Sequence, residues 1–167
     1  NAFARIRVVN PSYERLKVSC SLMLKAEFES KKGVILKQLH RDIRDYICPW
    51  VKGQSLELGR ELSKNDLFAF IRDQPYVRYI TGFSIVQVFE TAPDYYELRD
   101  TAGRESDAET LRPGNPWSVF VPVGEHLIHF VDKEAFGAPE QAAIDIMRIG
   151  SDFVVLPDEN QPEISAR

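Results

Sequence analysis

Hydrophobic and polar residues alternate along residues 14–28, ERLKVSCSLMLKAEF. The apolar positions share one parity: Leu16, Val18, Cys20, Leu22, Leu24, Ala26 and Phe28. The opposite parity is mostly polar: Arg15, Lys17, Ser19, Ser21, Met23, Lys25 and Glu27. A period of two predicts a β-strand with one face on a core and the other mostly in water, as is typical of antiparallel sheets. A slip of one residue would bury Lys17 and Lys25, so we expect one register.

Two amphipathic helices are predicted after this strand. Between residues 34 and 47, apolar side chains recur every four positions: Ile35, Leu39, Ile43 and Ile47. Pro49 ends this helix at or just before Cys48. Ser63 is the predicted cap of a second helix, which ends before Pro75 and has an inward stripe of Leu67, Phe70 and Ile71.

Residues 76–90 are rich in β-branched and aromatic side chains and are predicted to form a strand, with a bulge or bend at Gly82. Residues 91–116 form the least regular segment. Either residues 95–99 pair with 108–112 as a hairpin, or the acidic stretch is a mobile surface loop.

The C-terminal part is predicted to return to strands. Residues 117–123 form one, with Val119, Val121 and Val123 on one face, and residues 125–131 continue it after a break at 122–124. Residues 149–157 are predicted to be the last strand, and residues 158–167 a frayed tail.

A strand followed by an amphipathic helix indicates a helix that covers the apolar face of a sheet. We therefore predict an α+β fold: a two-layer sandwich of a mostly antiparallel or mixed β-sheet with two amphipathic helices packed on one face. We expect residues 1–90 to form its βαβαβ-like core and 91–116 to be an acidic loop or hairpin elaboration. Residues 117–157 should complete the same domain.

Composition narrows the classes of function. The chain has 167 residues, a net charge of −4 and scattered lysines and arginines, so nothing indicates nucleic-acid binding. No apolar run is long enough for a membrane span, and no signal peptide opens the chain. Because it begins at Asn1 without methionine, we expect a fragment or a processed piece. Cys20 and Cys48 allow one disulfide, but a reduced intracellular protein is the simpler interpretation.

The sequence offers weak candidates for catalysis or metal binding and none of the common cofactor motifs. His126 and His129 are the best metal candidates, but odd spacing in a strand places them on opposite faces. His40 and Asp42 stand two apart on the polar stripe of a helix, which indicates solvated surface. The carboxylates of residues 94–109 are typical of a flexible acidic loop.

Aromatic residues beside prolines give the clearest hint of binding. Trp50 and Trp117 each adjoin a proline. Such residues either cap a core or anchor an interface. The residues considered as a possible interface are Arg15, Lys17, Met23, Lys25, Trp50 and Trp117.

Three segments together resemble the C-terminal region of baseplate J-like proteins, the wedge components of contractile phage tails and related injection systems. These are VVNPSYERLKVSCSLML, DIRDYICPW and LELGRELSKNDLFAFIRDQPYVRYITGFSI. The shared features are an N-P-x-Y lead into a long strand, a helix that ends in a C-P-W-like break, and an L-G-x-x-x-x-x-x-x-L-F segment. NPWSVFVPVGEHLI and MRIGSDFVV are similar to the tail of the versions in injection systems. The resemblance covers most of residues 8–155.

The resemblance implies a structural protein without catalysis or cofactor, which packs against other baseplate or wedge subunits and hub proteins. It implies assembly in the cytoplasm and then a place in the particle, with no nucleic acid, membrane insertion or small-molecule substrate. Two alternatives stay open. One is an enzyme domain with a site in the 91–129 region that uses His126, Asp94 and Glu97. The other is a ligand- or peptide-binding module on the open sheet face, for which Met23 is the hint.

Overall fold

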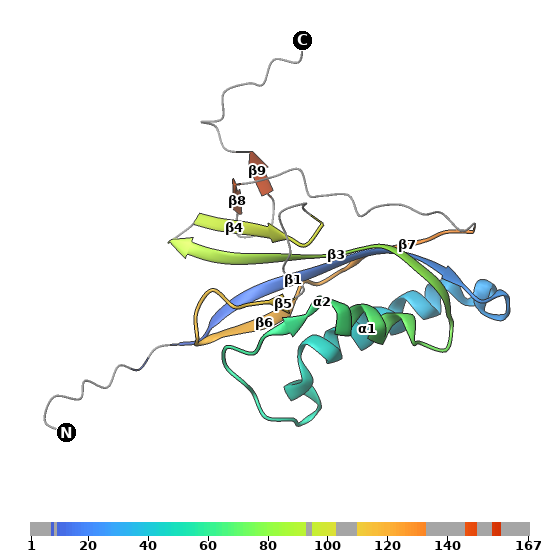
Figure 1. The fold of residues 1–167 in the computed structure, drawn as a ribbon, viewed down its shortest axis with the longest axis horizontal. Helices are drawn as coiled ribbons and strands as arrows, with labels where there is room; N and C mark the ends of the chain where they lie inside the picture. The colour runs from blue at the N-terminus through green and yellow to red at the C-terminus, as the bar shows by residue number, and fades with distance from the viewer. Residues whose placement is uncertain are drawn as a thin grey trace, which may run out of the picture.

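A long central strand, β1 (Ser12–Leu24), organises the sheet. The computed structural model describes Val8 and residues 10–92, 95–102, 110–132, 146–149 and 155–157. These residues form a seven-stranded sheet in the order β6-β1-β3-β4-β8-β9, with β7 also beside β1 (Figure 1). The remaining strands of this sheet are β3 (Val77–Ala92), β4 (Tyr95–Asp100), β6 (Ser118–Pro122), β7 (Leu127–Phe130), β8 (Ile146–Ile149) and β9 (Val155–Pro157). Because β3 is antiparallel to β1 and both β6 and β7 are parallel to it, the sheet is mixed.

Burial confirms the alternating pattern of β1. Leu16, Val18 and Leu22 have no exposed surface, and the polar parity stays exposed or half-buried at Arg15 and Lys17. Each large apolar side chain buried in this way contributes roughly 1.5–3 kcal/mol to folding before conformational entropy is subtracted. The inward face of the strand is therefore the one that the sequence predicts.

β1 ends earlier than predicted, however. A 3-10 helix, η1 (Ala26–Lys31), replaces the last residues of the predicted strand. The backbone N–H of Lys25 donates to the carbonyl of Tyr76 (3.1 Å), and β3 begins only at the following residue, so β1 has no partner beyond this point. Phe28 leaves the sheet and packs edge-on against Tyr76, with ring centroids 6.5 Å apart.

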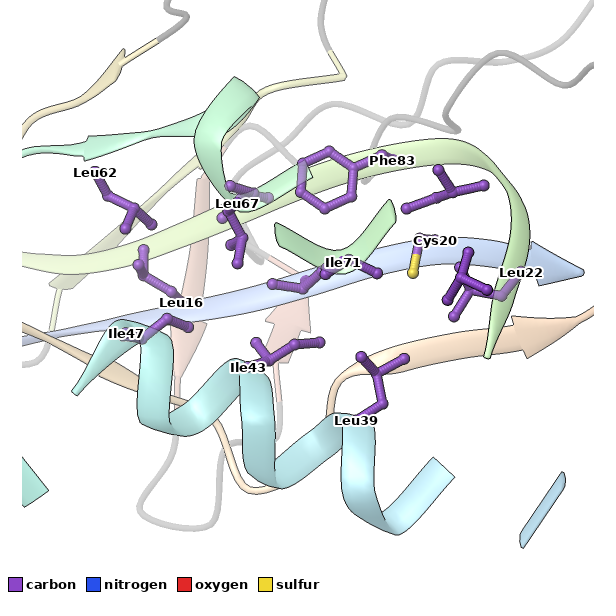
Figure 2. Packing of buried hydrophobic residues seen from close by; sticks show 14 of the residues in the cluster. Leu16, Cys20, Leu22, Leu39, Ile43, Ile47, Leu62, Leu67, Ile71 and Phe83 are labelled. Atoms are coloured by element: carbon purple, nitrogen blue, oxygen red, sulfur yellow. The ribbon is translucent and has the colours of Figure 1, made fainter. Parts of the chain in front are cut away.

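Helices α1 (Lys32–Ile47) and α2 (Lys64–Arg72) lie on the same side of the sheet, as Figure 1 shows. The buried stripe of α1 is the predicted one: Ile35, Leu39, Ile43 and Ile47. Figure 2 shows Ile47 near Leu16 and Leu39 near Leu22, so α1 runs antiparallel to β1. The α+β two-layer architecture is thereby confirmed.

The start of α2 follows the predicted capping. The hydroxyl of Ser63 accepts a hydrogen bond from the backbone N–H of Asp66 at 3.1 Å. Leu67 and Ile71 are fully buried, while Phe70 is half-buried. None of the helices in the described part of the chain is long and apolar enough to cross a membrane.

The predicted bulge at Gly82 is confirmed. The register of β1 against β3 shifts between Ser19 and Ser21, so that Gly82 and Phe83 together face Cys20. Gly82 has φ +61°, in the left-handed region that glycine adopts without strain.

The strands at the edge next to β1 also follow the prediction. β6 pairs with the first half of β1 and β7 with the second half, with the predicted break between them. By register, Val119 and Val121 stand opposite Tyr13 and Arg15, on the side of the sheet away from the helices. The C-terminal strands thus belong to the same sheet as β1.

Two predictions about the strands are wrong: the hairpin alternative for residues 95–112 and the continuity of the last strand. β4 pairs with β3 and β8 rather than with residues 108–112, because β3 is long enough to offer its backbone to β4 beyond Ile85. Thr110–Leu111 (β5) pairs instead with Leu62–Ser63 (β2), just before α2. Residues 149–157 are not one strand, since Ile149 ends β8, Val155 begins β9 and these two strands pair antiparallel. The predicted tail, residues 158–167, lies outside the described residues.

Candidate interaction surfaces

The side of the sheet opposite α1 and α2, here called the helix-free face, carries the polar parity of β1. On it Arg15 stands opposite Val88 and Lys17 opposite Val86. Lys17 is exposed, and the other three are half-buried. Positively charged side chains thus alternate with valines across this face. In a protein interface the charged side chains would suit the polar rim, and the valines would supply apolar contacts.

Two residues predicted to contribute to this face do not do so. Met23 lies on it opposite Tyr79, but only 8% of its surface is exposed. Lys25 lies beyond the end of β1, where its Nζ donates to the carbonyl of Pro75. The expectation that Met23 offers an exposed contact is therefore wrong, and the hint of a ligand- or peptide-binding module on this face is lost with it.

The two tryptophans differ in their surroundings. Trp50 lies in the 3-10 helix η2 (Pro49–Lys52), is half-buried and packs against the hydrophobic core. Trp117 precedes β6 and is 43% exposed. The two interpretations that the sequence left open thus separate: Trp50 caps the core, and Trp117 is available to a partner.

Two other segments are joined to the start of β6, directly after Trp117, and they carry exposed apolar residues. Three further exposed apolar residues come from β1 and from the loop before β2: Tyr13 (65%), Leu56 (51%) and Leu58 (53%). The backbone N–H of Gly59 donates to the carbonyl of Ser118 at 2.9 Å, and this bond brings the loop against the start of β6. We call these four residues (Tyr13, Leu56, Leu58 and Trp117) the Trp117 cluster.

A buried polar network supports the segment that carries Trp117. Glu14 is 2% exposed, and its carboxylate accepts hydrogen bonds from Gln87 Nε2 (2.6 Å) and from the backbone N–H of Gly114 (2.7 Å). The Gln87 amide also donates to the carbonyl of Arg112 (3.1 Å). This network was not predicted, although the carboxylate of Glu14 on the apolar parity of β1 was the available signal.

The two histidines nearest the core form a stacked pair. The rings of His40 and His126 lie 5.6 Å apart between centroids at 13° to one another. His126 Nδ1 accepts a hydrogen bond from the backbone N–H of Val18 (3.2 Å). Val18 lies between the part of β1 that pairs with β6 and the part that pairs with β7. The backbone N–H of His126 donates to His40 Nδ1 (3.3 Å). The expectation that His40 is solvated surface is therefore wrong.

Both imidazoles are held neutral. Burial is the main cause that lowers the pKa of His126 to about 4, and repulsion from a protonated His40 ring and from Lys17 adds to it. Burial also lowers the pKa of His40, an effect that the carboxylate of Glu125 partly offsets. Since each Nδ1 accepts a hydrogen bond, neutrality is required by the geometry as well.

The structure does not bring together the residues of the candidate metal and enzyme sites, and it places His126 and His129 on opposite sides, as their odd spacing predicts. His129 is exposed on β7 and faces the helix-free side, away from His126. Glu97 lies on β4, and β1 and β3 separate that strand from β7 by roughly 14 Å at the usual strand spacing. Asp94 and most of the acidic segment lie outside the described residues. Within the part of the chain that the structure describes, no group of three or more His, Cys, Asp or Glu residues could hold a metal ion.

The cysteines form no disulfide. Both are free and buried, and burial raises the pKa of Cys20 to about 12 and that of Cys48 to about 11. The Cys48 thiol lies 3.7 Å from the carbonyl of Phe120. These are thiols with little thiolate character at neutral pH.

Comparison with known proteins finds no family model and no curated protein that matches this chain.

Proposed function

We propose that this chain is a structural assembly module of the baseplate of a contractile phage tail or a related injection system, and that it acts by protein-protein packing. Its partners would be other wedge subunits and hub proteins. It would assemble in the cytoplasm and then become part of the particle. The resemblance of residues 8–155 to baseplate J-like proteins motivates this proposal. The Trp117 cluster is the structural observation that best supports a role in protein-protein packing.

The Trp117 cluster has the properties of an interface anchor. Tryptophan and tyrosine dominate the binding energy of protein interfaces, and here both are substantially exposed. The backbone around Trp117 is restrained by hydrogen bonds from Gly59 to Ser118 and from Gly114 to Glu14. A restrained anchor loses little conformational entropy when a partner binds, so more of the burial energy is available for affinity.

The cluster continues onto the helix-free face. Tyr13, Arg15 and Lys17 alternate along β1 and therefore point to the same side of the sheet. An apolar centre bordered by cations matches the usual anatomy of a protein interface, in which a polar rim surrounds a buried apolar patch. We infer that a neighbouring subunit covers the Trp117 cluster and reaches towards Lys17.

Replacing the anchor tests the proposal. Cells would co-express the chain with the cognate baseplate components, and complexes would be isolated by affinity capture and size-exclusion chromatography. Trp117→Ser should keep the melting temperature of the free chain but weaken the complex by about 30-fold or more, the effect of losing an interface hot spot. Tyr95→Ser, which alters an aromatic residue that is 67% exposed elsewhere on the sheet, serves as the matched control and should leave the complex intact.

The proposal fails if co-expression yields no complex and no particle contains the chain. It also fails if the Trp117→Ser and Tyr95→Ser variants weaken the complex equally, because the cluster would then have no special role.

A further inference from the structure

The outer side of α1 carries an open groove of about 640 Å³, at the end of the sheet away from the Trp117 cluster. Its lining comes from η1 and the first half of α1: Ser30, Lys31, Gly33, Val34, Lys37, Gln38, Arg41 and Asp42. This volume is within the range of ligand sites in proteins. We call it the α1 groove.

The cations of the α1 groove have no partners of their own. Within the described part of the chain, Lys31, Lys37 and Arg41 take part in no ion pair or hydrogen bond. Other cations of the same helix and its flanks do pair: Lys32 with Asp132 (2.7 Å), and both Arg44 (3.5 Å) and Lys52 (3.1 Å) with Asp45. The groove therefore gathers exposed positive charges that no carboxylate of the described fold neutralises, although the net charge of the protein is −4.

The placement of these charges is unfavourable for the isolated helix. Lys37 and Arg41 stand four residues apart on one face, so their like charges repel. Lys31 occupies the N-cap position without a capping side chain, and the first turn contains no acidic residue to complement the helix dipole. The one carboxylate of the lining, Asp42, is half-buried; burial raises the pKa of the Tyr76 phenol, and the negative charge of Asp42 raises it further. Negative charge supplied from outside would relieve all of these repulsions.

We propose that the α1 groove binds an acidic segment of a partner protein. Its carboxylates would meet Lys31, Lys37 and Arg41, and an apolar side chain of the segment would cover Val34, a lining residue that is 67% exposed. Among the described residues that line the groove there is no aromatic side chain on which a base could stack and no continuous basic stripe, so a nucleic acid is a poorer match. This inference goes beyond the proposed function and does not depend on the Trp117 cluster.

Fluorescence anisotropy of a labelled dodecapeptide of glutamate, aspartate and leucine tests the inference with the whole chain. The peptide should bind, more weakly as salt is raised. Lys37→Glu should lower the affinity about tenfold or more. It removes one cation, and the new carboxylate can form an ion pair with Arg41 in competition with the peptide. The same substitution turns a repulsive pair into an attractive one, so the melting temperature should stay equal or rise. A variant that binds the peptide weakly at an unchanged or higher melting temperature has lost the binding site and not the fold.

Lys17→Glu makes the same charge change on the helix-free face and should leave the affinity of the peptide unchanged. Amide shifts in a heteronuclear NMR titration should be confined to residues 30–42. The inference is overturned if the peptide does not bind, or if Lys37→Glu and Lys17→Glu weaken it equally. Tighter binding of a single-stranded DNA oligonucleotide or of anionic vesicles at the same ionic strength would also overturn it. Loss of baseplate assembly in the Trp117→Ser variant has no bearing on these outcomes.

Discussion

Mild acid should destabilise this fold through His126, and replacing that one side chain should remove the effect. His126 is 7% exposed, and its Nδ1 accepts the hydrogen bond of the Val18 amide. Protonation of Nδ1 would set an N–H donor against the N–H donor of Val18, so that hydrogen bond would be lost. It would also place a positive charge beside the ring of His40 and near Lys17. The folded state therefore resists protonation at a pH where the unfolded chain accepts it.

The size of the effect follows from linkage. The pKa of His126 is about 4 in the folded protein, against about 6.5 for an unperturbed histidine in the unfolded chain. Because the folded pKa is the lower one, this stabilising contribution is complete above about pH 6.5 and is lost as the pH falls towards 4. The whole difference corresponds to about 3 kcal/mol, of which about 2 kcal/mol is already lost near pH 5.

Urea denaturation near pH 7.5 and near pH 5, followed by the fluorescence of the half-buried Trp50, measures this loss. His126→Asn keeps an acceptor that can reach the Val18 amide but does not titrate in this range. The free energy of unfolding of this variant should fall about 2 kcal/mol less than that of the wild type between the two pH values. His129→Asn, a change at an exposed histidine, should behave as the wild type does. Equal pH dependence in wild type and His126→Asn would refute the reasoning.

The other predictions concern backbone conformation and capping. Gly82→Ala should cost about 1–2 kcal/mol, because Gly82 has φ +61° but open space around it. Gly59→Ala should cost more, about 3 kcal/mol, because φ is +69° and a Cβ would also stand 2.8 Å from the carbonyl oxygen of Pro116. Equal losses in urea titrations of the two variants would contradict this ranking. Ser63→Ala should cost about 1 kcal/mol by removing the acceptor of the Asp66 amide, with Ser63→Asn close to wild type; a loss in both variants would mean that capping is not the cause.

Local patterns predicted most of the core. The period of two in β1 identified Leu16, Val18 and Leu22 as inward-facing, and the period of four in α1 identified its buried stripe. The cap at Ser63 and the bulge at Gly82 were also predicted correctly. Each of these features depends on residues that lie close together in the sequence. A short stretch therefore contains the information needed to predict it.

The candidate surface was predicted only in part. Lys17 and Trp117 are exposed as an interface would require, whereas Met23 is buried on the face that it was expected to expose. Parity shows to which side of the sheet a side chain points, but not whether anything covers it there. The contribution of Tyr13 to the Trp117 cluster was missed, because its neighbours in the cluster are distant in sequence.

The amino-acid sequence by itself therefore determined most of the apolar residues that face the core and, closely, where the two helices begin and end. Only the tertiary structure decided where β1 stops, which strands flank it and which side chains meet across the fold. Val18 and His126 are 108 positions apart and Glu14 and Gly114 are 100 apart, yet each pair shares a hydrogen bond. No local periodicity encodes such contacts, since they arise when distant segments compete for the same sheet edge and the same buried polar groups.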